Sequence, residues 1–205
     1  MMIVKIIISI LVSLIPFNKL RIFLLNLLNN YNIKYDSHIG FGTIIIAKNV
    51  NIKNSKIGIL NFIKIKYLDL SESSIANLNL IKEFSKFNCF NLSIIGSYNK
   101  IIGTDINNGY LKMNKSQFST SNIININNKF EIESDVVFGG RNSKINIGST
   151  IRKTIIKKNV YFGTSIFLVS GVEINQNVLV GAGSKITEDI YNEGLFVSHK
   201  IQKID

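Results

Sequence analysis

Residues 156–186 read IKKNVYFGTSIFLVSGVEINQNVLVGAGSKI, and a bulky apolar residue recurs in them at every sixth position. These residues are Ile156, Phe162, Leu168, Ile174, Val180 and Ile186. Side chains return to one face of an α-helix every 3.6 residues and to one face of a strand every two residues, so neither element alone explains a period of six. Self-similarity at a fixed period is typical of a solenoid, in which each unit stacks on its neighbours.

The same period occurs closer to the N-terminus. Three apolar residues followed by a small residue lie 18 positions apart, namely Ile39-Gly40, Ile57-Gly58 and Ile75-Ala76. Ile126, Ile132 and Phe138 are again six apart, and Phe138 lies 18 residues before Ile156. We therefore predict that residues 138–156 form one coil without an insertion.

The period divides the chain into three parts. Residues 37–190 are predicted to form an all-β solenoid, residues 1–36 a helical segment and residues 191–205 a C-terminal tail. Between about residues 59 and 125 the period blurs. There the segments IKEFSKF (81–87) and GYLKMNKSQF (109–118) either leave the coil or belong to imperfect coils.

Each six-residue unit is expected to be a short strand followed by a tight turn. Three units close a triangular coil, and successive coils stack at about 4.8 Å, the spacing of hydrogen-bonded strands. A second inward position falls four residues after each repeating residue, at Val160, Ile166, Val172, Val178 and Ser184. Small residues follow the repeating residue at Gly139, Gly163 and Gly181, where we expect the chain to bend sharply. Asn159 and Asn177 are expected at turns, because asparagine tolerates left-handed backbone.

The N-terminal segment is strongly apolar. Its uncharged stretch from Ile6 to Phe17 is too short to span a bilayer, and no cleavage site of a signal peptide follows it. A helix after Pro16 would place an apolar stripe on one side, formed by Phe17, Leu20, Leu24, Leu27 and Leu28. The helices either cap the open end of the solenoid or lie on the inner membrane surface, with Lys5, Lys19 and Arg21 among the headgroups.

Composition narrows the function classes. The 205 residues carry a formal net charge of +11, which suits an anionic partner such as a membrane surface, a phosphorylated cofactor or an acidic glycan. No basic run with interleaved aromatic residues supports nucleic-acid binding. The single cysteine, Cys89, excludes an internal disulfide and fits a reducing, cytoplasmic compartment. One cysteine and two histidines, widely separated, do not form a metal-ligand set.

The segment VYFGTSIFLVSGVEINQNVLVGAGSKITEDI (160–190) resembles the C-terminal signature of hexapeptide-repeat acyltransferases. The segments LIPFNKLRIFLLNLL and SHIGFGTII are similar to a subgroup of that family in lipopolysaccharide, O-antigen and capsule biosynthesis. The resemblance implies a left-handed parallel β-helix, a homotrimer, and acetyl-CoA as acyl donor in the groove between two neighbouring β-helices. It also implies a sugar acceptor, either an anionic glycan or a lipid-linked sugar.

The resemblance further implies a set of cofactor-binding residues. Thr164 in FGTS and Ala182 in VGAGS match positions whose backbone contacts the pantetheine arm, and Thr187 matches the threonine beside the cofactor. Gly163 and Gly181 accompany them, either as contacts or only as turn residues. Relatives often have lysine after this threonine, whereas Glu188 stands here and would repel a phosphate. Three nearby lysines could compensate, namely Lys185, Lys200 and Lys203.

The catalytic base has no clear candidate. In the resembled subgroup a histidine follows a stretch like FGGRNSK (138–144), yet the next ten residues, INIGSTIRKT, contain none. Only His38 and His199 are present in the chain, and a carboxylate such as Asp105 is not distinguished by its surroundings. The alternative to an O-acetyltransferase is therefore a degenerate β-helix that serves as a binding or structural trimer in glycan assembly.

Overall fold

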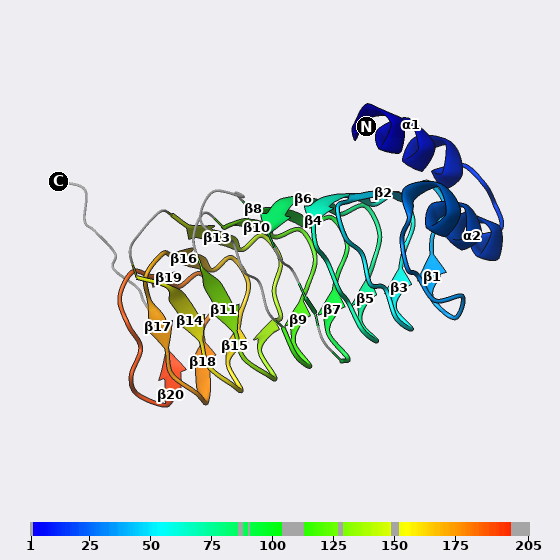
Figure 1. The fold of residues 1–205 in the computed structure, drawn as a ribbon. Helices are drawn as coiled ribbons and strands as arrows, with labels where there is room; N and C mark the ends of the chain where they lie inside the picture. Colours follow the sequence, from blue (N-terminus) through cyan, green and yellow to red (C-terminus); the bar gives the residue numbers. More distant parts are fainter. Residues whose placement is uncertain are drawn as a thin grey trace.

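The computed structural model describes residues 2–85, 88–89, 91–103, 113–126, 129–148 and 152–197. Two helices, α1 (Met2–Ser13) and α2 (Asn18–Asn29), precede a parallel β-solenoid that matches a left-handed parallel β-helix (Figure 1). The predicted fold class is therefore confirmed. His199, Lys200, Lys203 and Asp105 lie outside the described residues.

Two long parallel sheets form two faces of the solenoid. The first has nine strands in the order β1 (His38–Ile39), β3 (Lys56–Ile57), β5 (Ser74–Ile75), β7 (Ile94–Ile95), β9 (Gln117–Phe118), β12 (Val137–Phe138), β15 (Tyr161–Phe162), β18 (Val178–Val180) and β20 (Gly194–Phe196). The second has eight strands, β2 (Ile44–Ala47), β4 (Phe62–Lys66), β6 (Leu80–Ser85), β8 (Lys100–Gly103), β10 (Ile123–Ile126), β13 (Lys144–Ile147), β16 (Phe167–Val169) and β19 (Lys185–Ile186). Pairing of β20 with β18 continues the first sheet past residue 190, into the segment predicted as a tail.

The third face is regular only towards the C-terminus. Its sheet consists of β11 (Phe130–Ile132), β14 (Thr154–Ile156) and β17 (Glu173–Ile174). Closer to the N-terminus, isolated bridges join Asp69 to Asn88 and Asn114 to Ser134. Among the described residues, the N-terminal part of this face is therefore joined by isolated bridges and does not form a continuous sheet.

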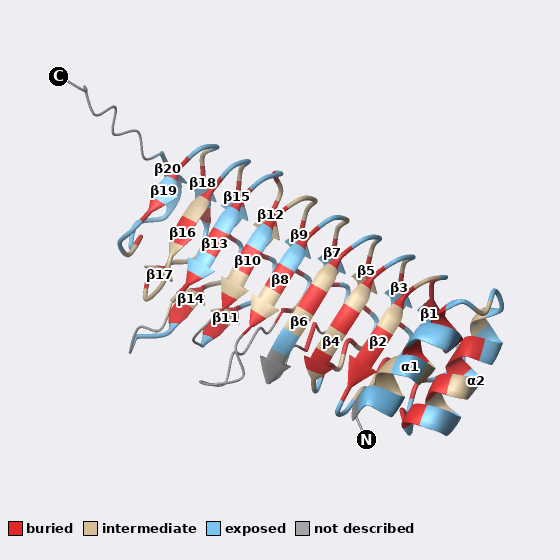
Figure 2. Cartoon of the chain, turned by 90° about the horizontal axis from the view of Figure 1, so that it is seen from above, coloured by how far each residue is buried: buried red, intermediate tan, exposed pale blue. Residues whose placement is uncertain are grey.

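Inward side chains of each sheet stack in register from coil to coil and form the core. Ile39, Ile57 and Ile75 align as predicted, and the same column continues through Phe118, Phe138 and Phe162. The phenylalanine rings are stacked, with centroids 4.5 and 4.3 Å apart. Figure 2 shows the resulting alternation of buried and exposed positions along the strands. Each Å² of apolar surface that these columns remove from water stabilises the fold by about 25 cal/mol.

The blurred middle consists of imperfect coils. Partner residues on successive strands of the first sheet lie 18, 18, 20, 23, 20, 24, 18 and 16 residues apart along the chain. The segment 81–87 begins inside strand β6, so as far as Ser85 it follows the coil. Segment 109–118 ends in strand β9, and its residues 109–112 lie outside the described residues.

The coil that begins at Phe138 contains an insertion, and the prediction that residues 138–156 form one uninterrupted coil was wrong. Phe138 pairs with Phe162 on the first sheet, 24 residues later, whereas Ile156 lies on the third face. The insertion adds six residues relative to the 18-residue coil from Phe162 to Val180. An insertion of one full repeat leaves the six-residue phase unchanged, which is why the period concealed it. Similarly, Ile124 occupies the column position that spacing assigned to Ile126.

The N-terminal helices cover the first coil (Figure 1). Asn18 pairs with the β1 edge through Oδ1, which accepts from Ile39 N at 2.9 Å, while its Nδ2 donates to Ser37 O. Ser9 Oγ donates to Ile45 O at 2.7 Å, and Ala47 N donates to the Tyr31 hydroxyl at 2.6 Å, so the β2 edge is paired too. These side chains satisfy backbone groups that an uncovered edge strand would leave open.

α2 packs on the solenoid through a face other than the apolar stripe found in the sequence. Most of that stripe is exposed, and α2 packs on the solenoid through Ile22 and Leu25. Arg21 is buried, and its guanidinium donates to the carbonyls of Ile39 and Ile15, so it cannot lie among lipid headgroups. Burial lowers the pKa of Arg21 below its ordinary value. Because α2 has apolar residues on both sides, either side could be buried. The side that carries Arg21 is buried, since there the guanidinium can donate to the carbonyls of Ile39 and Ile15.

Two backbone features recur at the corners of the coils: a close approach to the next coil and, two residues later, a left-handed φ. Gly163 is required by close approach, since a Cβ there would lie 2.8 Å from the Ala182 nitrogen; its φ is not in the left-handed region. Two residues later the chain does take left-handed backbone, at Ser165 and Gly183. Asn159 and Asn177 both have a φ of 57°, as predicted, and their amides are hydrogen bonded to each other at 2.8 Å.

Candidate functional site

The candidate site is the corner between the first and second sheets in the last two full coils. Gly163 and Thr164 follow β15, and Gly181 and Ala182 follow β18, one coil further on. Gly183 N donates to Thr164 O at 2.8 Å, which holds the two corners together. The side chains of Thr164 and Ala182 are exposed, so this corner offers backbone and small side chains to a ligand.

Lys185 and Thr187 lie just past this corner, at the end of the second sheet. Both are exposed, and Ile186 between them points into the core. The Lys185 ammonium lies 5.8 Å from the centroid of the Phe167 ring. The structure therefore brings together the predicted residues Gly163, Thr164, Gly181, Ala182, Lys185 and Thr187 within two neighbouring coils.

Sequence reasoning missed a further basic residue in the same column. Phe167 pairs with Lys185 on one side and with Lys144 on the other, so the two lysines flank one aromatic ring on adjacent strands. Lys144 is exposed and belongs to the coil with the insertion. Its separation of 41 residues from Lys185 is not a multiple of six, so the period could not reveal it. Glu188 is exposed and follows Thr187 directly.

His38 lies at the opposite end of the molecule. It is an exposed residue of β1, the first strand of the first sheet, whereas β15 and β18 are the seventh and eighth. At about 4.8 Å per strand, His38 is about 30 Å from the candidate corner. This distance excludes direct proton transfer between them within one protomer.

The insertion ends in a charged network on the third face. Arg152 Nη2 lies 2.8 Å from Asp189 Oδ2 and 3.7 Å from a Glu173 carboxylate oxygen. The Tyr191 hydroxyl donates to Asp189 Oδ2 at 2.5 Å. Hydrogen bonds from Arg152 and then Tyr191 lower the pKa of Asp189 from 3.8 to about 2. The end of the insertion is therefore tied to the last coil by a carboxylate that stays ionised at neutral pH.

Comparison with known proteins finds partial matches that include the bifunctional protein GlmU of several bacteria. The bifunctional protein GlmU of Helicobacter hepaticus is 41% identical over 56 residues, which cover 27% of this chain and 12% of that protein. GlmU of Streptococcus uberis is 34% identical over 74 residues, covering 36% of this chain and 16% of that protein. GlmU of Thermodesulfovibrio yellowstonii is 39% identical over 56 residues, again 27% and 12%. No protein-family model matches the chain.

These matches and the parallel β-solenoid support the hexapeptide-repeat acyltransferase family. The matched segments span only 12–16% of the length of these relatives. They therefore support the family in general and do not distinguish the subgroup to which the sequence motifs point.

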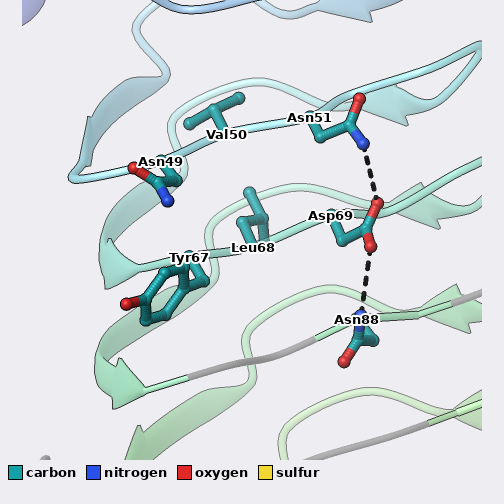
Figure 3. A pocket seen from close by; sticks show the side chains of 7 residues that line it. All are labelled: Asn49, Val50, Asn51, Tyr67, Leu68, Asp69 and Asn88. Atoms are coloured by element: carbon teal, nitrogen blue, oxygen red, sulfur yellow. Dashed lines mark hydrogen bonds between the residues drawn. The ribbon is translucent and has the colours of Figure 1, made fainter.

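A separate pocket of about 260 Å³ opens on the irregular part of the third face (Figure 3). Asp69 accepts from Asn51 at 3.3 Å and from Asn88 at 3.1 Å, and the exposed Tyr67 lines the other side of the pocket, near Asn49 (Figure 3). Tyr67 has a φ of 73° and Asp69 a φ of 140°. An aromatic ring beside amides and a carboxylate can contact both the apolar face and the hydroxyls of a polar ligand. The pocket lies in the first coils, remote from the Thr164 corner.

Cys89 is a core residue. It is buried, with its sulfur 3.9 Å from the sulfur of Met113, and burial raises its pKa well above the ordinary value. A reactive cysteine requires a lowered pKa and exposure, so Cys89 is unsuited to be a nucleophile. Within the described parts of the chain, no group of three His, Cys, Asp or Glu residues could hold a metal ion.

Proposed function

We propose that this protein is an acyltransferase that moves an acetyl group from acetyl-CoA to a hydroxyl group of a sugar. The acceptor is a sugar of lipopolysaccharide, O-antigen or capsule, presented as an anionic glycan or as a lipid-linked precursor. The protein acts as a homotrimer in the cytoplasm. The acceptor and the subgroup are proposed from the N-terminal motifs, and acyl transfer in general from the C-terminal signature and the partial similarity to GlmU.

The observation that carries the proposal is the stacking of Gly163-Thr164 on Gly181-Ala182. A side chain on Gly163 would meet the Ala182 backbone, so the two corners present a narrow and nearly bare edge. An extended pantetheine arm needs such an edge, because its amide groups pair with exposed backbone. Lys185 and Lys144 flank Phe167 beside this edge and supply positive charge for the cofactor phosphates.

In the proposed reaction the sugar oxygen attacks the thioester carbonyl carbon. A C–O bond forms, the C–S bond breaks, and coenzyme A leaves as the thiol. The hydroxyl proton must pass to a base. In the proposed trimer, with its axis along the solenoid, all three copies of His38 would lie about 30 Å from the corner, which argues against His38 as that base. His199 stays a candidate by sequence alone. The insertion of the coil from Phe138 to Phe162 occupies the place where the resembled subgroup carries its catalytic loop, although it contains no histidine.

Binding of acetyl-CoA to the Ala182→Trp variant tests this proposal. Ala182 is exposed, so an indole there should leave the fold intact and fill the edge. We expect titration calorimetry to detect acetyl-CoA binding to the wild-type protein and at least a tenfold weaker affinity in the variant. Ile59→Trp is the matched control, because Ile59 is exposed and holds the same position in the second coil. No binding to the wild-type protein at millimolar acetyl-CoA, or equal affinity in both variants, would refute the assignment of this corner.

The second candidate function is a binding or structural trimer without catalysis. The observation that favours it is the lack of histidine in residues 139–161, together with Glu188 in place of the usual lysine. Thioester cleavage separates the two functions. An enzyme releases free thiol from acetyl-CoA in the presence of an acceptor sugar, and this release falls in His199→Ala if that histidine is the base. A structural trimer binds acetyl-CoA or glycan without releasing thiol.

A further inference from the structure

The N-terminal helices have two apolar faces, and the solenoid covers only one. Val12 of α1 and Ile22 and Leu25 of α2 are buried in the core. The opposite side of α1 exposes five large apolar residues, Ile3, Val4, Ile7, Ile10 and Leu11. Their spacing forms one continuous stripe on a helix. The exposed apolar side of α1 is therefore available to contact a partner while its other side caps the solenoid.

The outer side of α2 continues this apolar surface. Leu20, Phe23, Leu27 and Leu28 are exposed, and so are Leu14 and Phe17 in the connection between the helices. Leu11, Phe17 and Leu27 are 62%, 69% and 63% exposed. Because both buried faces pack on the same end of the solenoid, both stripes point away from it. We call these eleven exposed residues the outer helical face. Soluble monomers rarely expose contiguous apolar patches of this kind, and such patches mark interaction sites.

The charges around this face select the partner. Neither helix contains an acidic residue, and Lys19 of α2 is exposed; in the turn after the helices, Lys34 and Asp36 are both exposed. Lys5 and Arg21 point inward, to Asn29 O and Ile39 O. The face is therefore apolar and positively charged at its margin, which complements an anionic lipid surface. A second copy fits less well, because packing this face on itself would bring the exposed Lys19 side chains of two copies together, and neither helix has an acidic residue to pair with them.

The helix lengths decide how the face would meet a bilayer. Each helix has 12 residues, or about 18 Å at 1.5 Å per residue, against about 30 Å of hydrocarbon. No helix in the described residues is long and apolar enough to cross a membrane. We infer that the outer helical face docks the protein onto an anionic membrane surface, with α1 and α2 lying in the plane of the interface.

Vesicle sedimentation of the full chain tests this inference. We expect binding to vesicles of equal parts phosphatidylglycerol and phosphatidylcholine, and several-fold weaker binding to phosphatidylcholine alone. The triple variant Ile7→Gln, Leu11→Gln and Leu27→Gln should reduce partitioning at least tenfold. Leu92→Gln is the control, because Leu92 is 67% exposed at a corner of the solenoid. Failure of the wild-type protein to bind anionic vesicles, or full binding by the triple variant, would overturn the inference.

A fluorescence measurement covers the case in which the triple variant does not fold. The chain has no tryptophan, so a single Leu27→Trp reports on its own surroundings. Anionic vesicles should shift its emission to shorter wavelength, while Leu92→Trp should not respond. A shift that depends on protein concentration and not on lipid would instead assign the face to a contact between copies and overturn the inference. Neither readout involves acetyl-CoA, so membrane docking and the proposed function can fail separately.

Discussion

At the scale of single residues, Arg21 decides how the N-terminal cap is held. Its side chain is 2% exposed and donates to two main-chain carbonyls, Ile39 O on the edge of β1 and Ile15 O at the end of the first helical segment. A hydrogen bond to a charged group contributes about 1.5–3 kcal/mol, and an orphaned buried carbonyl costs about 1–3 kcal/mol. The charge remains buried because these acceptors compensate for its desolvation.

The Arg21→Met variant tests this role. Methionine fills similar space but leaves both carbonyls without a donor, so we expect the free energy of unfolding to fall by about 2–3 kcal/mol. Lys19→Met on the same helix is the control, because Lys19 is exposed and should change stability by less than about 0.5 kcal/mol. Urea denaturation followed by circular dichroism measures both changes. Equal unfolding midpoints for the two variants would contradict a capping role for Arg21.

At the scale of elements, the sequence predicts the stacked columns of inward residues correctly but misses the insertion in the coil from Phe138 to Phe162. Ile39, Ile57 and Ile75 were placed correctly, because a strand column requires one apolar residue per 18-residue coil. Phe138 and Ile156 keep the same spacing although they lie on different faces. The spacing shows only that two residues are a multiple of six apart. It does not show which face of the coil each residue occupies, whereas the backbone pairing does. Likewise, the period of 3.6 identifies the apolar stripe that includes Leu20 and Leu27 but cannot tell whether the solenoid covers it, and the structure buries Ile22 and Leu25 instead.

Site residues at a fixed offset within the repeat could be predicted from the sequence. Site residues that meet only because the insertion or the stacking of coils brings them together could not be predicted. Thr164 and Ala182 follow repeating residues at fixed offsets, so their alignment could be read directly from the sequence. Lys144 reaches the same column only because the insertion shifts it there. Arg152 meets Asp189 across two coils, and no local pattern links residues so far apart.

Deleting residues 149–153 tests the role of the insertion. The deletion restores a spacing of six positions from Ile145 to Ile156 and places Gly148 where the next coil has Gly171, whose φ is 77°. We expect the shortened protein to fold with little loss of stability, because the Arg152 side chain that pairs with Asp189 is exposed to solvent, and to bind acetyl-CoA as before. Acyl transfer to the acceptor should disappear. Full transfer by the shortened protein would show that the insertion does not serve the reaction.

At the scale of the whole molecule, exposed apolar residues gather on one part of the first sheet. The outward positions of β15, β18 and β20 are Tyr161, Leu179 and Leu195, which pair in register and are 45%, 46% and 68% exposed. The outward positions of β1 and β3 are His38 and Lys56. The apolar column adjoins the Thr164 corner, so a protomer packed on it would also complete a groove there.

The proposed homotrimer should therefore depend on this column. We expect the wild-type protein to sediment at three times the 23.0 kDa mass of the chain, and Leu179→Arg to sediment as a monomer, because an arginine there would bury an unpaired charge in the interface. Leu92→Arg is the control, since it adds the same charge at an exposed corner just before β7, three strands away from β15 in the first sheet. Acetyl-CoA affinity should fall together with the trimer in Leu179→Arg, because the groove needs both of its walls. A monomeric variant that binds acetyl-CoA as tightly as the wild-type protein would place the cofactor on a single protomer and leave the trimer without a role in binding.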